Sequence, residues 1–308
     1  MKCLLPAMIS LCLSPVAALA QEPLSPLTYS GVVKIETLSV KNHPKTFAFA
    51  QFDLGYRFPV STGFTLGADV GVDAVKQSGN RADAVFAAAV LDSPYGKLSV
   101  GMPRLVIPQV FDTPAIGGSE VAQLVAGIFT GEILTDANLF KNTPTLRGVR
   151  YDGTFGQVTI AAALHEYDNS KNPLRQIAVT YDGGDWSATL GGQGINMGQF
   201  TEHQIKLALR AKHDKFSGGL VATRQFMGPG RENTLEVFGG YDVAHGIRVE
   251  AQAVDVVVNN DATLGFGIDA TYTMPSGVFV QAGLAETDAK SVKLLNSTLI
   301  NVGLGYKF

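Results

Sequence analysis

The sequence predicts an all-β protein, a transmembrane antiparallel β-barrel of about sixteen strands with one long loop folded inward. Three observations support this fold class. Mean hydropathy is +0.15 and charged residues make up 17% of the chain, fewer than the roughly 25% usual in soluble domains. No apolar run after the N-terminal segment approaches the ~18 residues that a membrane-spanning helix requires. Runs of strand length with a period of two recur instead as far as the last residue.

The N-terminal segment has the pattern of a secretory signal peptide. Lys2 precedes an apolar run over residues 3–16, and the small-residue motif at 18–20 is a cleavage site of the A-x-A type. We therefore expect a signal peptide at residues 1–20 and a barrel domain at 21–308; a core helix is the competing interpretation of this segment. Both cysteines lie in the apolar run, so the mature domain has no disulfide, metal-thiolate site or cysteine nucleophile.

The charge balance gives no sign of a nucleic-acid partner. The chain has 24 basic and 27 acidic residues, a net charge of −3. A nucleic-acid-binding surface requires an excess of basic residues.

Sixteen runs with strand-like alternation follow the signal segment. The clearest places Phe64, Leu66 and Val70 on one face and Asp69 and Asp73 on the other. In chain order, the runs cover residues 29–36, 51–58, 64–73, 82–91, 97–102, 146–151, 158–164, 177–181, 186–190, 204–210, 216–226, 235–243, 247–257, 264–274, 278–284 and 298–308. A soluble β-sandwich or β-solenoid remains the alternative, because a solvated strand face shows the same alternation.

The connections between runs predict antiparallel hairpins. No amphipathic helix stands between consecutive runs, and a parallel sheet would need one as a crossover. Short turns are expected at 93–96, 152–153, 182–184, 244–246 and 275–277, and longer polar connections at 227–233 and 288–297. Barrels of the outer membrane alternate short periplasmic turns with longer external loops in this way.

Residues 103–143 form the one long interruption of the strand pattern. Pro103, Pro108, Pro114 and the pair Gly117-Gly118 prevent a single regular element. Loops of this length are uncommon unless they are functional or disordered, and the apolar content of this one argues against disorder. We expect the loop to pack inside the barrel.

Two segments resemble known proteins. The last strand, TLINVGLGYKF, resembles the C-terminal strand of Gram-negative outer-membrane proteins, in which the barrel-assembly machinery recognises a terminal aromatic. The resemblance implies an assembly signal at Tyr306 and Phe308, export through the periplasm, and an outer-membrane location in contact with lipid and lipopolysaccharide.

The second segment, SPYGKLSVGMPRLVIPQVFDTPAIGGSE, resembles general diffusion porins, particularly the Rhodobacter-type group. Residues 96–101 match the G-K-L/I-x-x-G strand that leads into the constriction loop of those porins. The resemblance implies a homotrimer that lets small hydrophilic solutes and ions diffuse passively. The loop is less acidic than is usual in that group, so it leaves the cation or anion preference open.

An inward loop and inward-facing charges predict a charged constriction. Acids on one side of a narrow opening and bases on the other create a field that favours polar solutes. The acidic candidates on the loop are Asp112, Glu120, Glu132 and Asp136. The basic candidates with inward parity are Lys34, Arg57, Lys97, Arg150, Lys206, Arg210 and Arg248. The apolar loop residues Leu105, Ile107, Val110, Phe111, Leu124 and Phe129 are expected to dock on the inner wall.

The sequence offers no catalytic site. Ser119 lacks the second glycine of a G-x-S-x-G elbow, and the G-x-G-x-x-A match at 265–270 lies in a strand with no helix after it. We expect no enzyme activity and no cofactor beyond weak calcium binding by acidic loop residues.

Two other functions remain open. A solute-specific porin for a sugar or small organic anion would need a track of aromatics along the pore, and Phe47, Phe49 and Phe279 have inward parity without forming one. A plugged structural or adhesive barrel would fill its lumen with large side chains. The inward glycines Gly67, Gly71, Gly265 and Gly267 favour an open lumen instead.

Overall fold

The computed structural model describes residues 26–40, 43–77, 80–119, 146–166, 173–196, 201–259, 261–288 and 297–308. The predicted signal peptide at residues 1–20 lies outside this part of the chain. Among the described residues, no helix is long and apolar enough to span a membrane.

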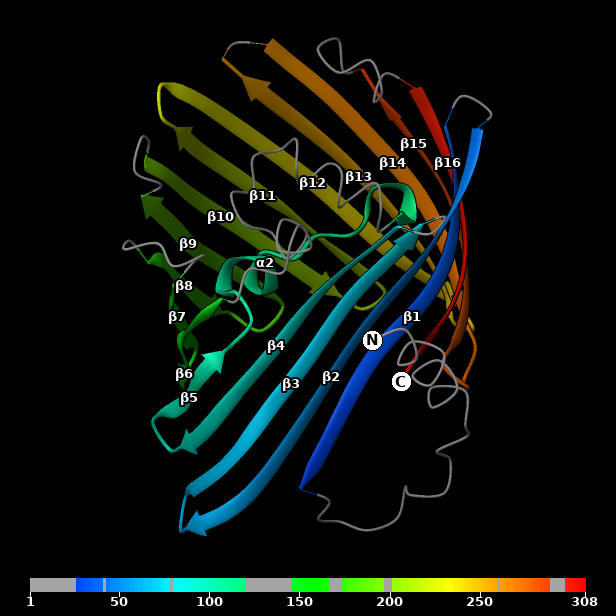
Figure 1. Cartoon of the computed structure of the whole chain (residues 1–308). Coiled ribbons are helices and arrows are strands. Elements are labelled where there is room, and N and C mark those ends of the chain that lie inside the picture. Colours follow the sequence, from blue (N-terminus) through cyan, green and yellow to red (C-terminus); the bar gives the residue numbers. More distant parts are fainter. Residues whose placement is uncertain are drawn as a thin grey trace.

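The described strands close into one antiparallel barrel (Figure 1). Each strand pairs with its neighbours in the sequence, and β1 also pairs with β16. The strands are β1 Leu27–Val40, β2 His43–Ser61, β3 Phe64–Gln77, β4 Asn80–Ser93, β5 Gly96–Met102, β6 Arg147–Phe155, β7 Val158–Glu166, β8 Leu174–Asp182, β9 Trp186–Asn196, β10 Thr201–His213, β11 Phe216–Met227, β12 Gly230–Ala244, β13 Ile247–Val258, β14 Asp261–Thr273, β15 Val278–Thr287 and β16 Ser297–Lys307. The predicted fold class and strand number are confirmed.

The predicted alternation places apolar residues outside and polar residues inside. In β1, Ile35 is 55% exposed on the outer surface, whereas its neighbours Lys34 and Glu36 are 2% and 0% exposed. In β10, Ile205 and Leu207 face outward in the same way. A strand shows alternate side chains to opposite faces, so one sequence can meet lipid and an aqueous lumen at once.

The connections at the two ends of the barrel differ in length. At one end, strands join through turns of two to four residues. The turn at His245-Gly246 is as predicted, and His245 has the positive φ of 50° that such a turn requires. Every connection longer than four residues lies at the other end, including the one between β5 and β6. This asymmetry identifies the short-turn end as periplasmic and the long-connection end as external.

Two predicted connections were wrong. The strand β6 does not end at Asp152-Gly153 but continues to Phe155. Asp152 is an inward-facing residue of the strand, and its carboxylate pairs with Arg150 at 2.7 Å. The expected polar connection at 227–233 is instead a two-residue turn, from which β12 starts at Gly230. Polar side chains occupy both faces of that strand end, so the sequence shows no apolar period there.

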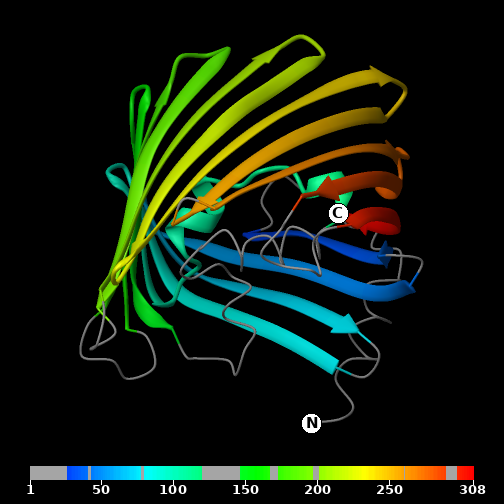
Figure 2. The ribbon, with the colours of Figure 1, turned by 90° about the horizontal axis from the view of Figure 1, so that it is seen from above.

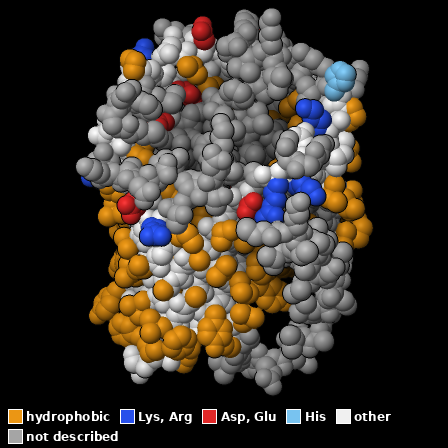
Figure 3. All heavy atoms as spheres, in the orientation of Figure 1, with side chains coloured by type: hydrophobic (Ala, Val, Ile, Leu, Met, Phe, Trp, Pro, Cys, Tyr) orange, Lys and Arg blue, Asp and Glu red, His pale blue; other side chains and the backbone are white. Residues whose placement is uncertain are grey.

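Aromatic side chains ring the short-turn end on the outer surface. The exposed members are Tyr29, Tyr56, Phe58, Tyr95, Phe155, Tyr181, Trp186, Phe216, Tyr241, Tyr272 and Tyr306. Amphipathic rings favour the boundary between hydrocarbon and water. On the face in Figure 3, hydrophobic side chains cover most of the lower part and charged side chains lie above it.

The segment after β5 enters the barrel, as expected for the first part of the long loop. It contains the short helix α2 (Val106–Val110) and the 3-10 turn η1 (Ile116–Gly118). The helix contacts β7, β8 and β9, and η1 contacts β13 to β16. Figure 2, seen from above, shows the segment inside the ring of strands. The segment therefore crosses the lumen between two parts of the wall.

Candidate pore constriction

Arg104 holds the point where the loop leaves β5. Its guanidinium donates two hydrogen bonds to Asp73, at 2.6 and 3.0 Å, and a third to Asp53 at 2.9 Å. It also lies 4.3 Å from the ring centroid of Phe86. A side chain on Gly71 would occupy the space of the guanidinium. The sequence analysis missed Arg104, although the inward parity of Asp53 and Asp73 was a signal for a basic partner.

Small side chains on the wall make room for α2. The buried apolar residues around it are Val106, Ile107, Phe111, Ala161, Ala163, Ala178, Ala208 and Val221. Gly191 has the same role, because a Cβ there would lie 2.7 Å from the Phe111 ring. The predicted docking of Leu105, Ile107 and Phe111 is confirmed by their burial. Leu124 and Phe129 lie outside the described residues.

A row of glutamines stiffens the wall on which α2 rests. The Gln176 side chain accepts a hydrogen bond from the backbone N–H of Val106 at 2.9 Å and donates one to Gln193 at 2.7 Å. Gln193 donates to Gln204, which donates to Gln225. The row thus links β8 to β11 and ends on Glu202. Buried amides that satisfy one another in this way hold the wall and the loop together.

The second docking point, at η1, rests on glycines of β14 and β15. A Cβ on Gly267 would lie 2.5 Å from the backbone nitrogen of Gly117, and a Cβ on Gly283 would lie closer still to the Gly117 oxygen. Gly117 and Gly118 have φ values of 58° and 70°, which few other residues tolerate. The inward glycine Gly267 therefore serves close approach of the loop and not an open lumen, contrary to our expectation.

Polar groups hold η1 on its other side. Lys34 donates a hydrogen bond of 2.6 Å to the carbonyl of Gly118, and Asn301 donates one of 3.0 Å to the same oxygen. Lys34 also forms an ion pair with Glu36 at 2.9 Å, and Glu36 accepts a hydrogen bond from Ser119. Lys34 is thus a buried anchor of the loop.

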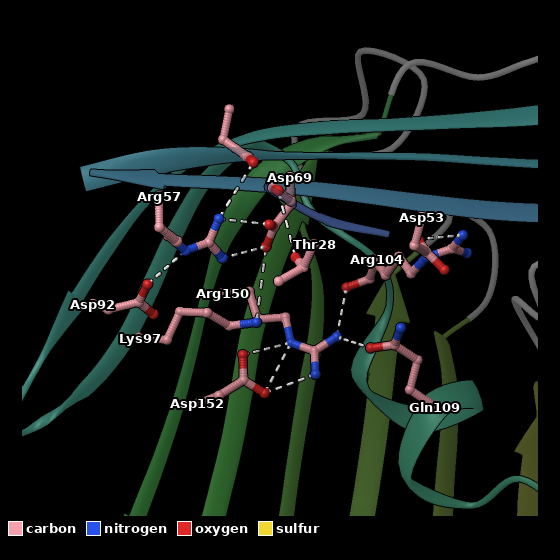
Figure 4. A network of polar contacts seen from close by, with 12 residues as sticks. Thr28, Asp53, Arg57, Asp69, Asp92, Lys97, Arg104, Gln109, Arg150 and Asp152 are labelled. Carbon is pink, nitrogen blue, oxygen red and sulfur yellow. Dashed lines mark hydrogen bonds and ion pairs between the residues drawn. The ribbon is translucent and has the colours of Figure 1, made fainter. Parts of the chain in front are cut away.

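A polar cavity of about 530 Å³ lies beside the loop, along β1 to β6. Three of the predicted basic residues and Arg104 line it (Figure 4). The bases are paired with carboxylates of the same wall. Arg57 lies 2.8 Å from Asp69 and 2.6 Å from Asp92.

The other two predicted bases of this cavity differ in how firmly they are held. Arg150 pairs with Asp152 and donates hydrogen bonds to Gln109 and to the carbonyl of Arg104. Lys97 lies 3.9 Å from Asp69 and remains 37% exposed. Lys97 is therefore the least constrained positive charge among these four.

The remaining predicted bases lie elsewhere on the inner wall. Arg210 donates hydrogen bonds to the carbonyls of Val110 and Asp112, at 3.3 and 2.7 Å, so it supports the loop behind α2. Lys206 lies 5.9 Å from the ring centroid of Phe111. Arg248 pairs with Asp242 and Glu250 near the short-turn end.

Of the four acidic candidates, only Asp112 belongs to the described residues, where it is exposed. Glu120, Glu132 and Asp136 lie outside them. In the part of the chain that the structure describes, no group of three histidine, aspartate or glutamate side chains could hold a metal ion.

Comparisons with known proteins agree with this geometry. A family model described as Gram-negative porin matches residues 7–308. No curated protein matches the sequence. A loop-deletion mutant of OmpT from Vibrio cholerae has a similar structure, with a TM-score of 0.70, 18% identity, and coverage of 92% of this chain and 99% of that one.

Other porin structures are similar as well. A porin refined at 1.8 Å has a TM-score of 0.67 at 14% identity, over 92% of this chain and 100% of that one. A mutant of Rhodopseudomonas blastica porin has a TM-score of 0.64 at 14% identity, with the same coverage. The match over nearly the whole chain, together with the closed barrel and its internal loop, shows that this protein belongs to the Gram-negative porin family and forms a channel in the outer membrane.

Proposed function

We propose that the protein is a passive, non-enzymatic channel for small hydrophilic solutes. One observation carries the proposal: a loop docked at two separate parts of the wall lies beside a polar cavity of about 530 Å³. A closed sixteen-stranded barrel without such a loop would admit solutes with little discrimination. The docked segment therefore sets the size limit, and the charges beside it set the local field.

We propose Arg57, Lys97 and Arg150 as the basic side of the constriction. Arg57 and Arg150 are held by nearby carboxylates, so each contributes a fixed local dipole more than a free charge. Polar solutes of either sign find complementary groups there, and apolar solutes do not. Asp112, Glu120, Glu132 and Asp136 remain proposed as the acidic side.

A homotrimer is the proposed assembly. The Vibrio cholerae OmpT structure is described as a trimer form. On this chain, the outer faces of β2, β3 and β4 carry small residues at paired positions. Ala50 pairs with Ala74, and Ala68 pairs with Ala89. Small outward residues allow a neighbouring barrel to approach closely at the level of these alanines. Larger outward side chains, such as Tyr56 and Leu66, lie on the same strands nearer the short-turn end.

A solute-specific or closed barrel is the second candidate, favoured by apolar side chains inside the lumen. Phe86, Leu174 and Ile195 belong to one buried cluster, and Val254 and Leu299 belong to another near η1. Inward side chains of this size narrow the bore. Such a channel would pass fewer solutes than a general diffusion porin.

Ion conductance of the purified, folded protein in a planar bilayer tests the proposal. We expect stable steps that scale with salt concentration, in groups of three for a trimer. Swelling of proteoliposomes in sugars of increasing size then gives the size limit. Folded protein that conducts no ions would overturn the open channel and favour the closed barrel.

A further inference from the structure

The glutamine row of the inner wall has a direction. Its four members, on the consecutive strands β8 to β11, occupy positions that pair with one another across the sheet: Gln176, Gln193, Gln204 and Gln225. In each contact the Nε2 atom of one amide donates to the Oε1 atom of the next, at 2.7, 3.1 and 3.3 Å from β8 to β11. The amide dipoles are therefore aligned head to tail across three strand spacings, about 14 Å of wall.

Both ends of the row require this same direction. At the β8 end, the Gln176 Oε1 atom accepts a hydrogen bond from the backbone N–H of Val106, which can only donate. At the β11 end, the Gln225 Nε2 atom donates to the Glu202 carboxylate at 2.6 Å, and an ionised carboxylate can only accept. Reversing the four amides would place a donor against the Val106 N–H and an acceptor against the carboxylate. The direction of the row is thus fixed jointly by Val106 and Glu202.

The row is sensitive to its ends because it is buried. The four glutamines and Glu202 are each 6% exposed or less, although they lie on the inner wall. A buried amide that loses its partner bears the full desolvation penalty of the unpaired group. Loss of the acceptor at one end therefore favours reorientation of the neighbouring amide, which passes the mismatch to the next amide along the row.

The other end of the row lies at the first residue of α2. Leu105, which precedes Val106, gives the helix no side-chain cap. Gln176 supplies the acceptor that a capping side chain would otherwise provide. Arg150 and Arg210 bind carbonyl oxygens on either side of the helix, whereas Gln176 holds it by an N–H. Loss of the Gln176 contact would free the first turn of α2 from the wall of β8 (Figure 1).

We propose that Glu202 is a positioning residue of the pore, which acts on α2 through the glutamine row. Its carboxylate lies on β10, two strands away from Gln176. By accepting from Gln225, it sets the direction of every amide, so that an oxygen and not an NH2 group faces Val106. The proposal rests on the channel function proposed above, in which the docked loop sets the size limit. It adds a residue of the distant wall to the groups that determine this limit.

Amide hydrogen exchange of the folded protein in detergent, resolved to single residues at alkaline pH, measures the Val106 contact directly. In Glu202→Leu the row loses its terminal acceptor, so we expect the Val106 amide to exchange at least about tenfold faster than in wild type. Glu202→Gln removes the same charge but keeps an acceptor oxygen, so exchange should stay within about twofold of wild type. Gln225→Leu removes the donor of the same link and should accelerate exchange as Glu202→Leu does.

A double variant distinguishes transmission along the row from general loosening of the wall. Gln176→Leu removes the Val106 acceptor itself, so adding Glu202→Leu to it should accelerate exchange no further. Two separate sites with no shared partner would instead multiply their effects. Gln252→Leu is the matched control, because Gln252 is a buried inward glutamine of β13 that donates to Glu236, outside the row. The control should leave exchange of the Val106 amide within about twofold of wild type.

Four outcomes would each overturn the proposal: wild-type exchange in Glu202→Leu or Gln225→Leu, equal acceleration in Glu202→Gln, multiplied effects in the double variant, or equal acceleration in Gln252→Leu. Bilayer conductance of the same preparations is the second readout, and it should change in Glu202→Leu but not in Glu202→Gln. Exchange is measured on folded protein whether or not it conducts. Wild-type protein that conducts no ions would therefore reject the channel function, while the exchange rates still decide whether Glu202 positions α2.

Discussion

At the scale of single residues, the ion selectivity of the pore depends on which charged side chains are already neutralised by a partner. Arg57 and Arg104 each contact two carboxylates, and Arg150 contacts one. Lys97 has only a distant contact with Asp69. Paired charges change the net field little, so the selectivity of the cavity depends strongly on Lys97.

The variant Lys97→Gln tests this dependence. Removing one positive charge should raise the permeability of cations relative to anions, by up to about fivefold, since a unit charge at 4 Å in water contributes about 1 kcal/mol. The reversal potential under a salt gradient measures the ratio. Lys76→Gln, the same charge change on the outer face of β3, is the control and should leave the potential unchanged. Equal shifts in both variants would contradict a role for Lys97 in the cavity.

At the scale of elements, the loop is positioned by the space left on the wall. The helix α2 rests on alanines and Gly191, and η1 rests on Gly267 and Gly283. Each of these two wall sites has room for the loop because the wall positions carry alanine or glycine and not a larger residue. The width of the constriction is therefore encoded in strands far from the loop in sequence.

The variant Gly283→Ala should displace η1 from the wall. Its new methyl group would overlap the carbonyl of Gly117, and overpacking of this kind costs about 1–3 kcal/mol. We expect a barrel that folds normally but shows a changed, more variable single-channel conductance. Gly239→Ala is the matched control, because a Cβ there lies 3.8 Å from its nearest neighbour. Identical conductance of the two variants would show that η1 does not depend on this contact.

At the scale of the whole molecule, the barrel closes where its two ends meet. Phe308 and Gly31 exchange backbone hydrogen bonds of 3.1 Å in both directions. The Phe308 ring lies 6.2 Å from that of Tyr29 and 6.0 Å from that of Phe52, so it covers β1 and β2 as well as its own strand. The terminal aromatic thus joins the first and last strands.

We expect Phe308→Ala to weaken this closure, apart from any effect on assembly in the cell. Loss of the ring contacts should destabilise the folded barrel by about 2 kcal/mol. Protein refolded in detergent, where no assembly machinery is present, should convert to the unfolded gel band at a lower temperature than wild type. An unchanged transition temperature in vitro would show that the Phe308 ring does not stabilise the closed barrel and would leave only its predicted role in the assembly signal.

The sequence by itself determined the barrel, because a period of two over sixteen strands and the absence of a spanning helix leave few other ways to satisfy the backbone in lipid. It also located the loop after the fifth strand and the inward parity of Arg57, Lys97 and Arg150. It failed where both faces of a strand are polar, as in β12, since no apolar period marks such a strand.

Only the tertiary structure decided which inward residues meet. Arg104 contacts Asp53 and Asp73, and Lys34 contacts Gly118, across separations of 31 to 84 residues. Parity places a side chain on the inner face but not at a height or beside a partner. Those depend on strand register and on the path of the loop, which arise from the packing of the closed barrel as a whole.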